Sequence, residues 1–340
     1  MIRGDVSGPV SIPEEPPSLE QFLIVDLQPV PVLPLLAALL AGAYVCGWIR
    51  LRMLKRPWPV WRGGLFLIGC LLIAATTGTR LEGYGYELFS VFMFQQLTLM
   101  MAIPPLLVLG SPGTLLLRAT PHHGVGRLLL RIAIAGLQSR VSRFVLHPGF
   151  MIPLFLFAFY GIYLSNIANV LLNTWLGHLG LELSFLAAGI LFTVPLISSD
   201  PLPKRQSHLG RLVDLFSEMP LHAFFGVIVM MAITPLVPYF ASPPPSWAID
   251  PVADQSIAGA LAWSYGEAPT LALALVLLAR WYRDDTRLAR ARDFRIDRTG
   301  DPELEAYNRY LQRLTAHDRM RESASGARTA AERPNQGTTG

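Results

Sequence analysis

The stretch FSVFMFQQLTLMMAIPPLLVLGSP, from Phe89 to Pro112, is almost entirely apolar and yet carries two adjacent amides, Gln95 and Gln96, in its middle. As a helix, an apolar run of this length is long enough to cross the ~30 Å hydrocarbon core of a bilayer. Polar side chains inside such a helix are costly, so each one marks a candidate site or an interhelical hydrogen bond.

The composition of the whole chain is that of a membrane protein. Of its 340 residues, 52% are hydrophobic and 15% are charged, whereas soluble domains carry about 25% charged residues. The net charge of +4 indicates basic cytoplasmic loops rather than nucleic-acid binding. Cys46 and Cys70 both lie in apolar runs, so the sequence contains no disulfide framework.

Seven apolar segments predict an all-α, polytopic bundle of seven transmembrane helices, because only helices satisfy every backbone group across such spans. They cover residues 30–49, 62–80, 87–109, 149–171, 175–198, 218–241 and 257–282. Every second connection is rich in arginine and lysine, and the positive-inside rule assigns these connections to the cytoplasm. The N-terminus is therefore predicted outside and the C-terminus in the cytoplasm, with the bundle in the cell membrane.

The remaining segments flank this membrane domain. The predicted parts are a disordered extracytoplasmic tail (1–29), the membrane domain (30–283), a cytoplasmic amphipathic helical region (284–318) and a disordered tail (319–340). The N-terminus shows no cleavable signal peptide. Within the membrane domain, residues 113–147 suit a helix on the inner leaflet, with a solvated helix as the alternative. Asp301 is expected to cap a helix that begins at Pro302.

Few ionisable or strongly polar side chains fall inside the predicted spans. They are His178, Glu182, His222 and Glu267, together with Gln95 and Gln96. At about 1.5 Å per residue, Gln96, Glu182, Glu267 and a methionine of the sixth span fall in one layer near mid-membrane. His178 lies one turn from Glu182 on the same helix face.

The thioether and imidazole groups of these spans predict a Cu(I) site, because soft ligands select Cu(I). The candidate metal ligands are His178, Met93, Met100, Met230 and His222, and the candidate polar pocket consists of Gln95, Gln96, Glu182 and Glu267. A carboxylate in that pocket could instead hold Cu(II) or relay a proton. Each group also has a structural alternative, since methionine fills cores, and amides and protonated carboxyls bond neighbouring helices.

Other functions have less support. A bis-histidine haem is not expected, because His178 lies near the outer end of its span and His222 near the cytoplasmic end of its own. The two side chains would be ~20 Å apart along the membrane normal. No span carries a phosphate-binding loop, a nucleophile elbow or an HExxH motif, so the chain is not expected to be an enzyme. A transporter would show interrupted helices in two repeats, and the sequence has no such symmetry.

The opening stretch resembles the central signature of the CtaG, or caa3-type, cytochrome c oxidase assembly membrane proteins. Similar segments follow in order: LGLELSFLAAGILFTVPLISSDPLP, MPLHAFFGVIV, DQSIAGALAWSYGEAPTLALALVLLARWYRDD and, as in actinobacterial members, DPELEAYNRYLQRL. The resemblance implies a factor that assembles a haem–copper oxidase, through Cu(I) handling or insertion. It also implies oxidase subunits and a copper donor protein as partners, in the lipid bilayer.

The chain departs from this family pattern at three positions. Phe92, Gln96 and Leu183 stand where the resemblance implies histidines. These departures leave an alternative open, in which the chain is a scaffold that binds no metal and contacts oxidase subunits or another respiratory membrane complex. Pro104 and Pro105 are expected to end or kink the third span at the cytoplasmic edge.

Overall fold

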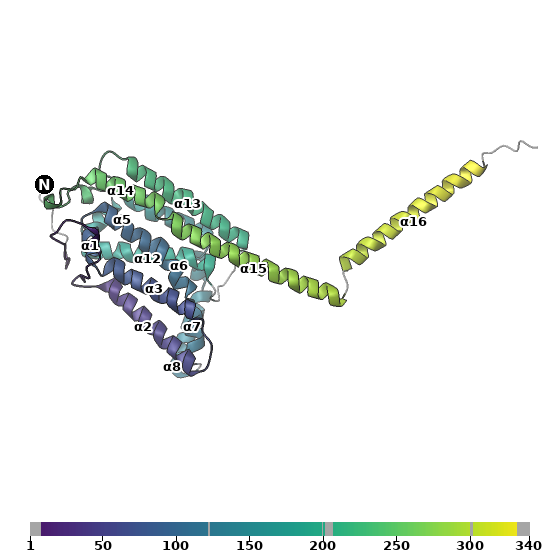
Figure 1. The fold of residues 1–340 in the computed structure, drawn as a ribbon, viewed down its shortest axis with the longest axis horizontal. Helices are drawn as coiled ribbons and strands as arrows, with labels where there is room; N and C mark the ends of the chain where they lie inside the picture. The colour runs from purple at the N-terminus through teal and green to yellow at the C-terminus, as the bar shows by residue number, and fades with distance from the viewer. Residues whose placement is uncertain (1–7, 122, 199, 201–206, 300–301, 332–340) are drawn as a thin grey trace, which may run out of the picture. The chain divides into compact units, whose positions relative to one another are not determined.

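The computed structural model describes residues 8–121, 123–198, 200, 207–299 and 302–331, and most of these residues lie in helices (Figure 1). The only β-type pairing among the described residues is an isolated bridge between Val25 and Thr79. The chain divides into two compact units, Met1–Ala279 and Arg280–Gly340. The all-α prediction is confirmed for the described part of the chain.

The first unit contains a bundle of helices and the short elements that connect them. In chain order these are α1 (Leu19–Phe22), α2 (Val32–Met53), α3 (Val60–Thr77), α4 (Arg80–Gly85), α5 (Phe89–Leu97), η1 (Thr98–Ala102), α6 (Ile103–Leu109), α7 (Pro112–Ala119), α8 (Gly124–Gln138), α9 (Arg140–Val145), α10 (Pro148–Leu156), η2 (Phe157–Gly161), α11 (Ile167–Leu172), α12 (Trp175–Ile197), α13 (His208–Met231), η3 (Pro238–Ala241), η4 (Pro245–Trp247) and α14 (Pro251–Ser264). Helix α15 (Glu267–Thr299) begins in this unit and continues into the second.

Six helical runs are long and apolar enough to cross a membrane, which makes this a membrane protein. They are Val32–Met53, Val60–Thr77, Phe89–Ala119, Trp175–Ile197, His208–Met231 and Pro251–Ile296. At the remaining predicted span, residues 149–171, the apolar helix Pro148–Gly161 is shorter. The hydroxyl of Ser165 donates to the Gly161 carbonyl and accepts from the Ile167 amide, which replaces the regular backbone bonds there. The seven-span count and the orientation stay predictions.

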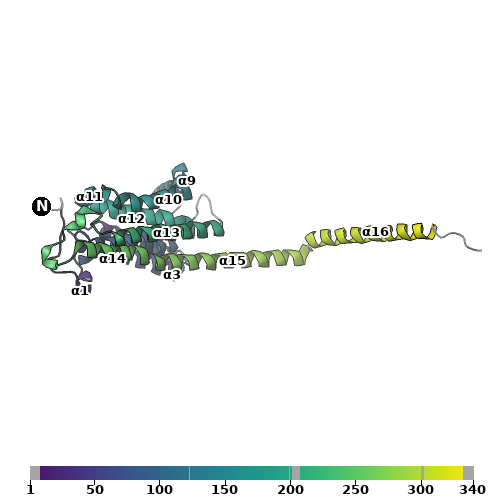
Figure 2. The same ribbon diagram turned by 90° about the horizontal axis from the view of Figure 1, so that it is seen from above.

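Helices α13 and α14 lie side by side (Figure 2) and make the most extensive contact between two helices of the bundle. A Cβ atom on Gly226 would lie 2.7 Å from the Gly259 carbonyl oxygen, and one on Gly259 would lie 2.6 Å from the Gly226 oxygen. Neither position therefore has room for a side chain. Such paired small residues let two helix backbones pack in contact, which is a main source of helix association in lipid.

Two buried polar residues of α14 satisfy the backbone of other segments. The Asp254 carboxylate accepts from the amide of Phe89 at 2.6 Å and from that of Ser90 at 3.3 Å, so it caps the start of α5. The Gln255 side chain accepts from the Leu236 amide at 2.7 Å, in the loop that follows α13. The Asp254 bonds satisfy amides that the start of a helix leaves without partners, and the Gln255 bond satisfies a loop amide, as a low-dielectric interior requires.

The stretch from Phe89 to Leu109 is one helical run with a π-helical turn, η1, in its middle. The amide of Ile103 bonds to the Thr98 carbonyl, five residues back. The helix does not end at Pro104 and Pro105, because α6 continues to Leu109. Since Pro104 has no N–H, the bond that a regular helix would form four residues back is missing, and the wider turn lies at that place.

Residues 8–29, which the sequence predicts as part of a disordered tail, pack against the start of the bundle. Gln28 accepts from the Ser11 amide at 2.8 Å and donates to the Ser11 carbonyl at 3.0 Å. The Tyr84 hydroxyl of α4 donates to the Glu15 carbonyl at 2.9 Å. This N-terminal segment therefore covers α4.

The second unit contains the C-terminal part of α15 and helix α16 (Pro302–Ala331). Helix α16 begins at the expected Pro302 and runs past residue 318, into the stretch predicted as disordered. The expected capping residue, Asp301, lies outside the described residues. On α16, Leu304, Tyr307 and Leu311 are all exposed.

Candidate metal centre

Helix α12 places two ionisable side chains on one buried face near its start. The side chain of Thr174 caps the helix by accepting from the Gly177 amide at 3.0 Å. His178 and Glu182 follow, four residues apart, and are 0% and 3% exposed. Residues at this spacing stand above one another on a helix, as the sequence predicts for this pair.

The third member of the group is Glu82, on the short helix α4 between α3 and α5. The Thr79 hydroxyl oxygen caps α4 by accepting from the Leu81 amide. Glu82 is 4% exposed. A Cβ atom on Gly85 would overlap the Gln95 side chain, so this glycine lets α4 pack directly on α5. The close packing of α4 brings a residue of a connection into the interior.

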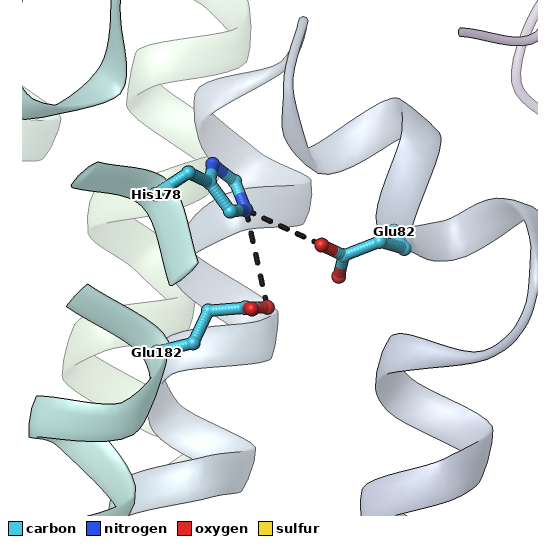
Figure 3. A group of neighbouring side chains, drawn as sticks. All are labelled: Glu82, His178 and Glu182. Atoms are coloured by element: carbon cyan, nitrogen blue, oxygen red, sulfur yellow. Dashed lines mark ion pairs between the residues drawn. The ribbon is translucent and has the colours of Figure 1, made fainter. Parts of the chain in front are cut away.

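The three side chains converge on one point (Figure 3). His178 Nε2 lies 3.6 Å from Glu82 Oε1 and 3.9 Å from Glu182 Oε1. One ligand atom from each residue lies within 4.8 Å of the other two. Ligands about 2.0–2.2 Å from a tetrahedral ion are roughly 3.3–3.6 Å apart, so the two distances from His178 Nε2 need to shorten by at most a few tenths of an ångström to suit a metal.

Several buried atoms of the group have no hydrogen-bond partner. They are both ring nitrogens of His178, Glu182 Oε1 and, beside them, Gln95 Oε1. Buried polar atoms are nearly always satisfied, and exceptions point to a missing water or ion. A cavity of about 20 Å³, lined in part by Glu82 and Glu182, has room for one water-sized particle. The donor set therefore fits a metal ion.

Neighbouring side chains hold these donors in place. The ring of Tyr86 stacks on the His178 imidazole at 3.8 Å between centroids, and the Phe92 ring lies 5.2 Å away. The Gln95 amide donates to Glu82 Oε2 at 2.7 Å and to the Thr76 carbonyl at 3.2 Å. Partners of this kind orient ligands and tune their affinity.

The charge of Glu82 is sensitive to its surroundings. Burial raises the pKa of this carboxyl to about 7, while hydrogen bonds with Glu182 and Gln95 act in the opposite direction. A cation between the two carboxylates would stabilise their charged forms.

The sequence of this chain matches a known protein family. The sequence model of the cytochrome c oxidase caa3 assembly factors matches residues 42–284. The chain belongs to this family. Uncharacterized proteins of Mycobacterium bovis and Mycobacterium tuberculosis are each 38% identical to it over 280 residues, which is 81% of this chain and 42% of theirs. An uncharacterized protein of Mycobacterium leprae is 37% identical over 283 residues, 82% of this chain and 43% of its own.

The chain thus spans about two fifths of the length of the curated relatives it matches. No solved structure matches it.

Two of the departures from the family pattern acquire different meanings in the structure. Phe92 contacts the His178 ring, so a ligand at this position would adjoin the centre. Leu183 is 36% exposed, one residue beyond Glu182 and about 100° around the helix. A histidine at 183 would face away from the centre, so its absence removes no ligand from this group.

The structure does not collect the other predicted residues into this centre. Gln96 accepts from the Tyr163 hydroxyl, and Met93 and Met100 are buried in the main apolar core. Met230 is half-buried on α13, with its backbone against Gly259. His222 and Glu267 belong to a separate group. Of the predicted residues, His178 and Glu182 belong to the centre, and Gln95 adjoins it through its hydrogen bond to Glu82.

Glu82 is not among the predicted site residues, because it lies between the second and third predicted spans and not inside one. Its signal was the surrounding motif TGTRLEGYGYE, where Thr79 precedes a possible helix start and two glycines allow close packing. Only the folding of α4 against α5 reveals which side of that short helix is buried.

Proposed function

We propose that this protein is a cell-membrane assembly factor for a haem–copper cytochrome c oxidase, and that it holds copper as cargo between Glu82, His178 and Glu182. Membership of the assembly factor family supports the first part and suggests a role without catalysis. The observation that carries the second is the buried triangle of donors, in which both His178 ring nitrogens and Glu182 Oε1 lack hydrogen-bond partners.

The donor set favours the divalent ion. One imidazole and two carboxylates are borderline to hard ligands, and divalent copper stands at the top of the affinity order for such sites. This differs from the thioether-rich Cu(I) site expected from the sequence. Two carboxylates would also offset the charge of a divalent cation in a medium of low dielectric constant.

The predicted orientation places the centre towards the outer face. His178 is the fourth residue of α12, and the preceding connection is predicted to be extracytoplasmic. Loading by a donor protein and transfer to oxidase subunits would then take place on that side.

The test combines a binding assay with an assay in cells. The double variant Glu82→Gln/Glu182→Gln keeps the side-chain shapes and removes both negative charges. Purified in lipid nanodiscs, it is expected to lose the stoichiometric Cu(II) that the unmodified protein binds. In cells that lack the native gene, it is expected to leave the oxidase deficient in copper and activity.

Glu87→Gln is the matched control, because Glu87 is a buried carboxyl on the same connection but outside the donor triangle. It should behave like the unmodified protein in both assays. Normal oxidase copper in cells that carry the double variant would contradict the cargo proposal. It would favour the scaffold alternative, which the apolar Phe92 beside His178 also supports.

A further inference from the structure

Two irregular helix segments meet in the interior of the bundle, away from the Glu82–His178–Glu182 triangle. The run Pro251–Ile296 is interrupted at Tyr265–Gly266, between α14 and α15. The Tyr265 hydroxyl lies 3.0 Å from the Thr98 hydroxyl, at the start of the π-helical turn η1. Both π-helical turns and broken helices inside membranes are features of functional sites.

His222 of α13 faces this place with a free lone pair. Its side chain is fully buried, and Nδ1 lies 3.1 Å from the Glu218 carbonyl oxygen. A carbonyl can only accept, so this bond puts the ring proton on Nδ1 and leaves Nε2 as a bare acceptor. Nε2 has no hydrogen-bond partner. Histidine ligands of metals are commonly oriented by just such a bond from the other nitrogen.

A methionine thioether faces the same point. A Cβ atom built on Gly266 would lie 2.8 Å from His222 Nε2 and 2.8 Å from Met101 Cε. The imidazole nitrogen and the end of the Met101 side chain thus border one spot, which only a glycine leaves open. A methionine side chain has three rotatable bonds, so its sulfur can turn to that spot without a backbone shift.

A negative charge stands next to this pair. Glu267 follows Gly266 in the first turn of α15, is half-buried and interacts electrostatically with His222. A cation bound by neutral ligands in the bundle would be stabilised by this carboxylate.

We propose that His222 Nε2 and Met101 Sδ form a second metal site, specific for a soft monovalent cation, Cu(I), with Glu267 as the neighbouring charge. Imidazole and thioether together select Cu(I) over harder ions. The site shares no residue with the Glu82–His178–Glu182 centre, so it stands or falls independently of the proposed function. The geometry assigns Met101 to it, whereas the carbonyl oxygen of Met100 lies against Gly189 of α12.

The deciding experiment is copper K-edge X-ray absorption on the purified protein in nanodiscs, loaded with Cu(I) under reducing conditions. It is done in the Glu82→Gln/Glu182→Gln background, which removes the other centre. One bound Cu(I) with both a sulfur and an imidazole scatterer is the expected result. No retained Cu(I), or a spectrum without sulfur, would overturn the proposal. This test changes no residue of the proposed Cu(I) site.

Competition with a Cu(I) chelator then identifies the ligands. Met101→Leu, which conserves volume, should remove the sulfur scatterer and weaken Cu(I) binding at least about tenfold. Gly266→Ala should weaken it as well, because its methyl group would occupy the spot between the two ligands. The matched control Met100→Leu should bind Cu(I) normally. Equal losses in Met100→Leu and Met101→Leu would contradict the assignment.

The two copper proposals can fail separately. Loss of Cu(II) binding in Glu82→Gln/Glu182→Gln with retained Cu(I) supports both sites. Retained Cu(II) in that variant would reject the first centre and leave the second untouched.

Discussion

At the scale of single residues, the two adjacent amides of the opening stretch serve different partners. Gln95 donates to the Glu82 carboxylate and the Thr76 carbonyl, whereas Gln96 accepts from the Tyr163 hydroxyl. Neighbouring residues project about 100° apart on a helix, so Gln95 reaches Glu82 of the candidate centre and Gln96 reaches Tyr163.

This division predicts that two matched substitutions differ in their effect on Cu(II) affinity. Gln95→Leu removes the donor that orients Glu82 and should lower Cu(II) affinity by about 10- to 100-fold. Gln96→Leu removes an amide of the same size one residue away and should leave the affinity unchanged. Isothermal titration with Cu(II) checks both variants. An equal loss of affinity in the two would contradict the prediction, because it would come from disturbed packing and not from the loss of the bond to Glu82.

Phe92 and Leu183 form a second matched pair. In Phe92→His, the new imidazole would stand beside the His178 ring and is expected to tighten Cu(II) binding by at least about tenfold, or ~1.4 kcal/mol. In Leu183→His, the new imidazole faces outwards and should change nothing at the centre. Titration of both variants checks the expectation, which fails if Leu183→His gains as much affinity as Phe92→His.

Part of the centre could be predicted from the sequence. The spacing of His178 and Glu182 within one apolar helix sets them on one face whatever the rest of the chain does. Glu82 could not be found in this way, because its burial depends on tertiary packing of a six-residue helix. The sequence also predicts Met93 and Met100 as ligands. Methionines that fill a core have no sequence pattern that separates them from methionines that bind a metal.

At the scale of elements, α12 contacts the opening stretch through a position without a side chain. A Cβ atom on Gly189 would lie 2.1 Å from the Met100 carbonyl oxygen. The turn η1 is therefore packed against the backbone of α12, the helix that carries His178 and Glu182.

Two glycines of α12 are expected to respond differently to alanine. Gly189→Ala forces η1 and α12 apart and should cost about 1–3 kcal/mol, the usual range for overpacking. Gly180→Ala, where nothing lies within 4 Å, should be neutral or stabilising by about 0.5–1 kcal/mol through helix propensity. Thermal unfolding followed by tryptophan fluorescence in the same detergent compares them. Equal midpoints would show that the contact with η1 does not limit stability.

The elements themselves follow from the sequence wherever an apolar run is uninterrupted. Six of the seven predicted spans overlap apolar helices of sufficient length, but the span predicted at residues 218–241 is displaced, because its helix is His208–Met231. The sequence does not reveal the π-helical turn before Pro104, because the same residues would fit a regular helix up to the missing N–H. It also does not reveal the bends at 164–166, where the short side chain of Ser165 competes with the backbone.

At the scale of the whole molecule, the number of membrane crossings depends on the segment Pro148–Gly161. Single cysteines at Arg140→Cys and Asn173→Cys, both exposed positions on either side of it, are introduced after Cys46 and Cys70 are replaced by alanine. A membrane-impermeant thiol reagent should label Asn173→Cys from outside intact cells and Arg140→Cys only after permeabilisation. Labelling of both from one side would reduce the count to six.

The N-terminal segment would limit the rate at which an ion leaves the proposed centre. Gln28, Val30 and Pro31 line the small cavity beside Glu82 and Glu182, and Ser11 and Pro13 lie against Gly83 of α4. An ion at the proposed centre would have to wait for this covering to open before it could exchange with a chelator or a partner. Residence time and affinity would then be separate properties, and a site of modest equilibrium strength could still retain its copper until a partner loosens the cover.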